Sequence, residues 1–245
     1  MGESFDTLNK YFSEYTNTVH YFGNDILVRQ LADALYSGAV IEYEAPDIYL
    51  KLDNVVWIIE HFEFDCFRSN RKGSSLKREE CRIARAEENI IPTEQGVLFH
   101  DRITAESSYC DYINNVKRSF KAHYRKIDTY KHNLINARIA DENTIFKVIF
   151  LIDDASIFGS SCIDDTNNWS PVVLAHSKEF LEILEKVDSV DGILTGTSVD
   201  NEKYIWFIDR CQIDEYYKNV EGYDSFRFMN FVPHVLGYTI TIPRR

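Results

Sequence analysis

Acidic side chains are unusually dense between residues 42 and 65, in a stretch whose apolar residues predict two neighbouring β-strands. Seven carboxylates lie on or beside these strands: Glu42, Glu44, Asp47, Asp53, Glu60, Glu63 and Asp65. Acidic residues are poor strand formers, so their density on these predicted strands indicates a chemical role. The explanation we consider first is that some of these carboxylates act together.

Asp47 and Glu60 are the pair that the predicted hairpin brings together. The dipeptide Asp53-Asn54 is typical of a tight turn, and this turn sets Asp47 opposite Glu60 to within one residue of register. Converging carboxylates repel each other unless a cation lies between them, and oxygen-rich sites of this kind suit Mg²⁺ or Mn²⁺. Such a cation polarises a phosphate and helps to activate water. The alternative is a pair of acids at strand ends in an acidic protein.

Side-chain alternation along the second strand separates the remaining candidates. Ile58, Glu60, Phe62 and Phe64 share one face, and Ile59, His61, Glu63 and Asp65 share the other. His61 is a candidate for proton transfer or for the role of a fourth metal ligand, although its side chain points away from Glu60 in a regular strand. The alternative for His61 is a hydrogen-bonded core residue, and for Glu63 and Asp65 a solvent-facing strand.

A helix and a β-meander are expected to position these residues. Apolar residues at helical spacing predict a helix over residues 26–35, capped by Asn24 or Asp25. Three predicted strands follow, over residues 39–44, 47–52 and 55–65. After the break at Gly73-Ser74-Ser75, a helix capped by Ser75 is predicted over residues 76–88.

The second half of the chain alternates helices and strands, which is typical of an α/β sheet built from crossover connections. Residues 103–138 predict one long helix or two consecutive helices, because apolar and aromatic residues recur at steps of three and four. Further elements are a helix over residues 176–187, strands over 146–153, 192–195 and 203–208, and an edge strand over 235–242. We therefore expect one α/β domain over residues 1–245, with a mixed central sheet flanked by helices and a helical insertion at about residues 100–140.

Composition limits the classes of protein that this chain fits. Of its 245 residues, 44% are hydrophobic and 27% are charged, as in ordinary globular proteins, so wholesale disorder is excluded. Its apolar runs span about five residues, against the roughly 20 that a membrane helix needs, and its first residues lack the features of a secretory leader. Five cysteines at irregular spacings match neither a disulfide framework nor a zinc motif. We expect a reduced, cytoplasmic protein that does not bind membranes.

Charge is unevenly distributed along the chain. The net charge of −12 argues against a protein that coats nucleic acid with its whole surface. Residues 68–87, however, hold seven basic and three acidic residues, and residues 114–138 hold seven basic residues and one acid. The remainder carries 13 of the 27 basic and 35 of the 39 acidic residues, a balance of −22. Phosphate-bearing partners are expected at the two basic windows.

The residues expected to position a nucleic-acid backbone are Arg71, Arg78, Lys117, Arg118, Lys121 and Arg125. Tyr112, Tyr124 and Tyr130 lie among the basic residues of the second window, and their rings could stack on bases. The alternatives are solvated helix faces for the basic residues and core packing for the tyrosines.

Pro46-Asp47 and Glu60 also resemble a known motif. An acid after Pro, and a second acid thirteen residues later on a hairpin between an N-terminal helix and a further helix and strand, resembles the core of the PD-(D/E)XK phosphodiesterases. The resemblance covers the order of elements over residues 26–95 and, more loosely, to residue 208. It implies a restriction-endonuclease-like fold in which Asp47 and Glu60 bind the metal ion.

One position departs from the family pattern. The residue two places after the second acid is normally Lys in this family, and here it is Phe62. Some members take the lysine from a neighbouring helix, and the resemblance then points to Lys72 or Lys77, which follow the acidic hairpin in the first basic window.

These observations predict a metal-dependent endonuclease that cleaves phosphodiester bonds in DNA through an activated water, with Mg²⁺ or Mn²⁺ as cofactor. DNA is favoured over RNA, and a homodimer or another protein partner is compatible with the sequence. The alternative from another class is a non-enzymatic inhibitor, immunity-type or scaffolding protein with a catalytically dead nuclease-like fold, whose acidic surface meets a basic partner. A third reading is a phosphoesterase that acts on nucleotides or on a small phosphorylated substrate.

Overall fold

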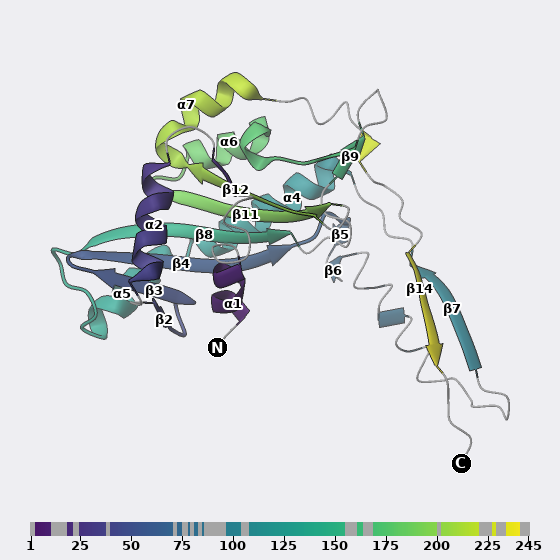
Figure 1. Ribbon diagram of the computed structural model, residues 1–245, viewed down its shortest axis with the longest axis horizontal. Coiled ribbons are helices and arrows are strands. Elements are labelled where there is room, and N and C mark those ends of the chain that lie inside the picture. Colours follow the sequence, from purple (N-terminus) through teal and green to yellow (C-terminus); the bar gives the residue numbers. More distant parts are fainter. Residues whose placement is uncertain are drawn as a thin grey trace, which may run out of the picture.

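A computed structural model gives the arrangement of most of the chain. It describes residues 3–10, 19–21, 25–37, 40–70, 73–74, 78, 81–82, 85, 97–103, 108–154, 161–163, 169–199, 202–220, 227–228 and 234–240. Within these ranges the protein is an α/β structure with a mixed sheet between two layers of helices (Figure 1).

The main sheet has the strand order β1-β12-β11-β8-β4-β3-β2. Its strands are β1 (Val19–Tyr21), β2 (Val40–Glu42), β3 (Ile48–Leu52), β4 (Val55–Phe64), β8 (Ile145–Asp154), β11 (Gly192–Val199) and β12 (Glu202–Asp209). β2, β3 and β4 form an antiparallel meander, and β4, β8 and β11 are parallel neighbours. The meander followed by crossover connections, predicted from the sequence, is confirmed.

Helices cover both faces of this sheet. They are α1 (Glu3–Asn9), α2 (Ile26–Tyr36), α4 (Tyr109–Tyr124), α5 (Ile127–Asn136), α6 (Lys178–Glu185) and α7 (Ile213–Tyr216). Short 3₁₀ turns, η2 (Leu174–His176), η3 (Arg210–Gln212) and η4 (Tyr217–Asn219), precede α6 and flank α7. α1 and α2 pack on one face, over Ile59 and Leu151, and α4, α5 and α6 pack on the other, over Ile58 and Phe150. The central strands are buried on both faces, which explains their nearly continuous apolar sequence.

The segment between residues 108 and 136 forms two consecutive helices rather than one. Ser108 caps α4 by accepting a hydrogen bond from the Asp111 backbone N–H. The chain then turns at Arg125 and Lys126, where the Lys126 N–H donates to the His123 carbonyl oxygen at 3.0 Å. This turn lets both helices lie along the sheet, so the helical segment is the crossover between β4 and β8 and part of the core.

Several elements differ from the sequence prediction. α1 and β1 lie in the first 25 residues, where no regular pattern was found. The predicted tail strand is present as β14 (His234–Ile240), but it pairs with β7 (Val97–Ile103) and not with the main sheet. β9 (Ser161–Ile163) pairs with β10 (Trp169–Pro171) and β13 (Arg227–Phe228), and β5 (Ser69–Asn70) pairs with β6 (Gly73–Ser74). Periodicity indicates which face of a strand is apolar but not which strand it pairs with.

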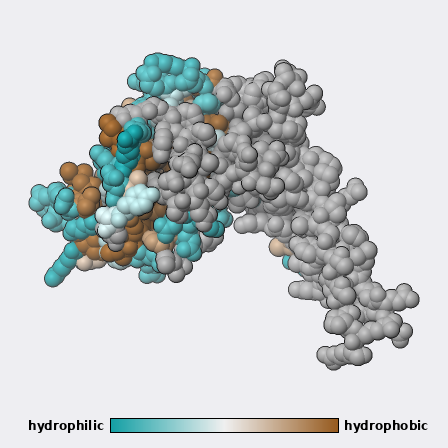
Figure 2. All heavy atoms as spheres, in the orientation of Figure 1, coloured by the Kyte–Doolittle hydropathy of each residue, from teal (hydrophilic) through white to brown (hydrophobic). Residues whose placement is uncertain are grey.

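None of the helices in the described part of the chain combines the length and the apolar character that crossing a bilayer requires. Figure 2 shows hydrophobic and hydrophilic residues interspersed where the surface is described. Exposed apolar side chains include those of Ile26, Ile41 and Leu52. Scattered exposure of this kind is normal for a folded protein.

Asn115 ties the end of β4 to α4, and its removal is expected to destabilise the fold. The side chain is buried, and its Nδ2 donates to the carbonyl oxygens of Asp65 at 2.7 Å and Phe67 at 2.8 Å. In Asn115→Ala these carbonyls lose their donor, which should cost about 1–3 kcal/mol of unfolding free energy. Urea denaturation measures this loss. The matched control is the exposed neighbour, Asn114→Ala, and equal stability of the two variants would contradict the assignment.

Candidate active site

The β3–β4 hairpin brings Asp47 and Glu60 together. Ile48 pairs with Ile59 and Leu52 pairs with Val55, so Asp47, the residue before β3, stands opposite Glu60. The turn uses Asp53 with a φ of 53°, a left-handed conformation that Asp tolerates better than most residues. The register predicted from the turn is confirmed.

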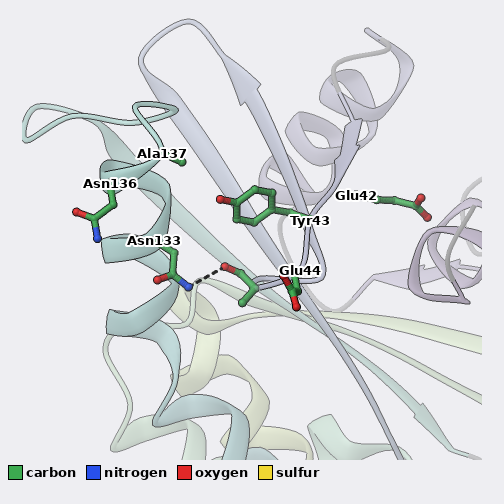
Figure 3. Close-up of a pocket in the computed structure, with 7 residues that line it drawn as sticks. Glu42, Tyr43, Glu44, Asn133, Asn136 and Ala137 are labelled. Carbon is green, nitrogen blue, oxygen red and sulfur yellow. Dashed lines mark hydrogen bonds between the residues drawn. The ribbon is translucent and has the colours of Figure 1, made fainter.

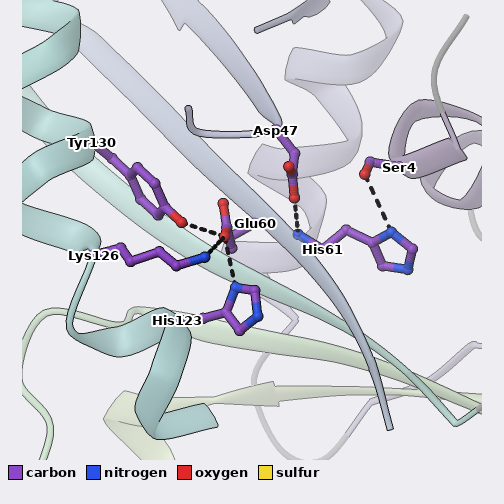
Figure 4. Close-up of polar contacts among 7 residues, drawn as sticks. All are labelled: Ser4, Asp47, Glu60, His61, His123, Lys126 and Tyr130. Carbon is purple, nitrogen blue, oxygen red and sulfur yellow. Dashed lines mark hydrogen bonds and ion pairs between the residues drawn. The ribbon is translucent and has the colours of Figure 1, made fainter. Parts of the chain in front are cut away.

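Glu60 is a buried carboxylate with an uneven set of partners. It faces α4 and α5, and its side chain is 4% exposed. Oε1 accepts a hydrogen bond from the Tyr130 hydroxyl, lies 2.7 Å from Nδ1 of His123 and lies 3.8 Å from Nζ of Lys126 (Figure 4). Oε2 is buried and has no hydrogen-bond partner among the described residues. Such an atom is costly unless something outside the protein satisfies it.

Asp47 is held in place by the backbone of β4. Its Oδ2 accepts a hydrogen bond from the His61 backbone N–H at 2.8 Å. Burial, and then the negative charge of Glu60, raise the pKa of the Asp47 carboxyl above its ordinary value. The two carboxylates therefore lie close together in a partly buried environment. Asp47 and Glu60 are residues that fit a bound cation.

Tyr130 supports the carboxylate as a neutral donor. Burial, followed by the hydrogen bond to Glu60, raises the pKa of the Tyr130 hydroxyl well above its ordinary value. Tyr130 therefore keeps its proton near neutral pH and fixes the orientation of Glu60. A fixed carboxylate leaves Oε2, and not Oε1, available to a ligand.

Phe62 fills the position at which the PD-(D/E)XK pattern has a lysine. It is buried, and its ring stacks on His123 with centroids 4.5 Å apart and an interplanar angle of 17°. The side chain helps to place His123 against Glu60 and supplies no charge. The cation near Glu60 is Lys126 instead, from the turn between α4 and α5.

His123, Lys126 and Tyr130 are the site residues that sequence reasoning did not select. His123 was not singled out, Tyr130 was considered only for base stacking or core packing, and Lys126 was counted in a basic window. Their spacing of three and four residues places them on one side of the helical segment. A His and a Tyr on an otherwise apolar face, next to a Lys, was the available signal.

The other predicted site residues lie elsewhere or outside the described residues. Arg71, Lys72 and Lys77 fall outside the described residues. His61 points to the opposite face of the sheet, where its Nδ1 lies 3.2 Å from the Ser4 hydroxyl of α1, so its predicted orientation is confirmed. Arg78 is a half-buried helical residue.

The residues of the second basic window that were predicted to bind a nucleic-acid backbone lie on α4 or at its C-terminal end. Arg118, Lys121 and Arg125 are exposed, and Lys117 is half-buried. Lys117 and Lys121 line a cavity of about 400 Å³ between α4 and α6. Arg118 donates to the Asn115 side-chain oxygen at 3.1 Å.

The suggestion that tyrosines of this window stack on bases is wrong for two of the three. Tyr112 and Tyr130 are buried in the core beneath the helices, with exposed fractions of 2% and 4%. Tyr112 packs edge-on against Phe64, with centroids 5.1 Å apart. Tyr124 is half-buried beside the cavity between α4 and α6. The helical spacing of these aromatic residues reflects core packing, which is the more frequent reason for such spacing.

A larger cavity lies between the β2–β3 connection and α5. It has a volume of about 930 Å³ and is lined by Glu42, Tyr43, Glu44, Ala45, Asn133, Asn136 and Ala137 (Figure 3). Asn133 donates to the Ala45 carbonyl oxygen at 3.2 Å and so joins α5 to the β2–β3 connection. Neither Asp47 nor Glu60 belongs to the lining of this cavity.

Comparisons with known proteins do not identify a family. No family model matches the chain, and neither the curated proteins nor the solved structures give a match. The functional argument therefore rests on the geometry of the carboxylates and their neighbours.

The raised pKa of Asp47 predicts a stability cost in the metal-free protein. The folded state binds the Asp47 proton more tightly than the unfolded state, so the contribution of this group to stability is largest below its ordinary pKa of 3.8 and is lost as pH rises through the folded pKa. Asp47→Asn removes this charge and can keep the acceptor for the His61 N–H. We expect it to raise the unfolding free energy at neutral pH by about 0.5–2 kcal/mol.

This effect is measured by urea denaturation in EDTA at neutral pH and at pH values approaching 3.8. The advantage of Asp47→Asn over the wild type should shrink as pH falls, because the wild-type carboxyl becomes protonated. The assignment would be contradicted if Asp47→Asn were less stable than the wild type at neutral pH. It would also be contradicted if the stability advantage of the variant over the wild type were the same at both pH values.

Proposed function

We propose that the protein is a metal-dependent phosphodiesterase that cleaves DNA by attack of an activated water. The observation that carries this proposal is the buried Oε2 of Glu60, without a hydrogen-bond partner in the described structure, beside Asp47, whose pKa is raised by burial and by Glu60. Opposed carboxylates of this kind suit Mg²⁺ or Mn²⁺ held by few protein oxygens and several waters.

The order of elements supports the same proposal. A helix, three antiparallel strands, a helical crossover and a parallel strand occur in the order α2, β2, β3, β4, α4 with α5, and β8. Asp47 precedes the middle strand of the meander and Glu60 lies on the last. This arrangement resembles the restriction-endonuclease-like core, on which phosphodiester cleavage is the expected chemistry.

Each neighbouring side chain has a role in this mechanism. Asp47 and Glu60 would hold the cation, which supplies Lewis acidity toward a phosphate oxygen and lowers the pKa of a bound water. Tyr130 and His123 hold the Glu60 carboxylate through Oε1. Lys126, whose side chain is 52% exposed, can approach a phosphate from solvent while its ammonium stays near Glu60. Its charge would stabilise the negative charge that develops on the phosphate.

The exposed basic residues near the end of α4 favour a polymeric substrate. Lys121 and Arg125 lie on the same helical segment as His123 and Lys126. A phosphate backbone that reaches Lys126 can therefore meet further cations on α4. Contacts to the backbone set position and carry no base sequence, so these residues do not determine a sequence preference.

The experiment that tests this function incubates the full-length protein with plasmid DNA, single-stranded DNA and RNA of equal length, each with Mg²⁺, Mn²⁺ or EDTA. We expect cleavage of DNA that requires the metal ion and that is absent in folded Asp47→Asn. Hydrolysis of short nucleotides without cleavage of polymers would replace the proposal with a small-substrate phosphoesterase. A folded wild type that neither cleaves nor binds metal would overturn it in favour of the interaction protein.

A further inference from the structure

A second group of metal-ligating side chains lies on the opposite face of the same strand. Because side chains alternate along β4, His61 and Glu63 point away from Glu60, toward the face that α1 and α2 cover. The parallel register of β4 and β8 sets Glu63 directly beside Asp153. One ligand atom from each of His61, Glu63 and Asp153 lies within 4.8 Å of the other two. Three donors from two central strands thus converge on one point.

The imidazole of His61 is arranged as that of a metal ligand would be. Nδ1 lies 3.2 Å from the Ser4 hydroxyl (Figure 4), and Nε2 is buried with no hydrogen-bond partner among the described residues. A metal-bound histidine usually gives its other ring N–H to an oxygen, which fixes the tautomer and leaves the remaining lone pair for the metal. Ser4 provides that oxygen, and Nε2 provides the lone pair.

The two carboxylates add an independent reason for a cation. Glu63 and Asp153 are direct neighbours on one face of the sheet, an arrangement in which like charges are destabilising. His61 is half-buried, Asp153 is half-buried and Glu63 is exposed, so solvent reaches the group from the Glu63 side. A divalent ion at this point would balance both charges and satisfy Nε2 at the same time.

We propose that His61, Glu63 and Asp153 bind a first-row divalent metal ion, with Nε2 of His61 and one oxygen from each carboxylate as ligands. The imidazole nitrogen suits Zn²⁺ and the two carboxylates also suit Mn²⁺, whereas the all-oxygen pair Asp47 and Glu60 suits Mg²⁺. Three protein ligands leave further positions for water. Since His61 also contacts Ser4, the bound ion fixes α1 against β4 and β8. This site does not depend on the proposed phosphodiesterase function.

The test measures binding of Mn²⁺ by calorimetry to the metal-free full-length protein in the Asp47→Asn background, which removes the other site. Mn²⁺ is the main probe because the exposed cysteines Cys81, Cys110 and Cys211 would compete for Zn²⁺. We expect binding in this background that weakens tenfold or more when Glu63→Gln or Asp153→Asn is added. Glu142→Gln, an exposed acid away from the group, serves as the matched control and should leave the affinity unchanged.

A second readout reports on the imidazole directly. With Zn²⁺ and alkylated cysteines, the ¹⁵N resonance of Nε2 of His61 should shift, and the ring resonances of His123 should not. Absence of binding in the Asp47→Asn background would overturn the proposal. Equal affinities with and without Glu63→Gln and Asp153→Asn, in variants that circular dichroism shows to be folded, would overturn it as well. Either result leaves DNA cleavage to be judged by its own assay.

Discussion

Glu60→Gln is expected to lower the rate of metal-dependent DNA cleavage by about a thousandfold or more. Gln has the length of Glu and keeps a carbonyl oxygen for the Tyr130 hydroxyl and the His123 ring, but its amide nitrogen replaces Oε2 and cannot bind a cation. The lost interaction is the one that supplies several kcal/mol of transition-state stabilisation in metal-assisted hydrolysis. The measurement is the single-turnover cleavage rate of plasmid DNA at saturating Mg²⁺.

Two controls separate this effect from misfolding. Glu142→Gln makes the same chemical change at an exposed position and should cleave at the wild-type rate. Calorimetry with Mg²⁺ should show that Glu60→Gln has lost its binding while circular dichroism and the melting temperature remain close to those of the wild type. A folded Glu60→Gln protein that cleaves within tenfold of the wild-type rate would exclude Glu60 from the site.

Lys126→Met is expected to reduce cleavage by about 10²–10³-fold, the usual effect of removing one preorganised charge from a developing anion. Met keeps much of the aliphatic stem and loses the ammonium, whose Nζ lies 3.8 Å from Oε1 of Glu60. The Lys126 side chain is 52% exposed and Oε1 keeps its contacts with Tyr130 and His123, so the variant should fold normally. Affinity for Mg²⁺ should not decrease, because Lys126 is not a ligand. Lys126→Arg, which keeps the charge, should recover part of the rate.

The matched control is Lys131→Met, on α5, the helix that begins directly after Lys126. Its Nζ lies 5.9 Å from the ring centroid of Phe146 and belongs to no part of the carboxylate site. This variant should cleave at the wild-type rate. If Lys126→Met also cleaved normally, the cation would have to come from another segment, and Lys72 and Lys77 would be the next positions to test.

The carboxylate pair was predictable because it depends on local rules. The Asp53-Asn54 turn fixes the register, and alternation fixes the face of Glu60, so the sequence of one hairpin is enough to place Asp47 beside Glu60. The partners of Glu60 were not predictable in this way. They come from helices 63 and 70 residues further along the chain, whose docking on the sheet depends on the whole core.

The aromatic residues of the second basic window illustrate the same limit. Tyr112, Tyr124 and Tyr130 share one helical periodicity, but one packs on Phe64, one borders a cavity and one holds the carboxylate. Periodicity gives the buried face of a helix and not the role of each residue on it. The pairing of β14 with β7 was unpredictable for the same reason, because an alternating pattern does not indicate which strand is the neighbour.

The site is divided between the sheet and the helices that cover it, and this division affects the chain before it is fully folded. The carboxylates belong to the meander, which is complete early in the sequence, whereas Lys126 and the donors that hold Glu60 arrive only when α4 and α5 dock. On the proposed mechanism, a nascent or partly unfolded molecule with its sheet formed but these helices detached cannot cleave DNA. On this mechanism, catalytic competence depends on the docking of α4 and α5 and is therefore a late event of folding.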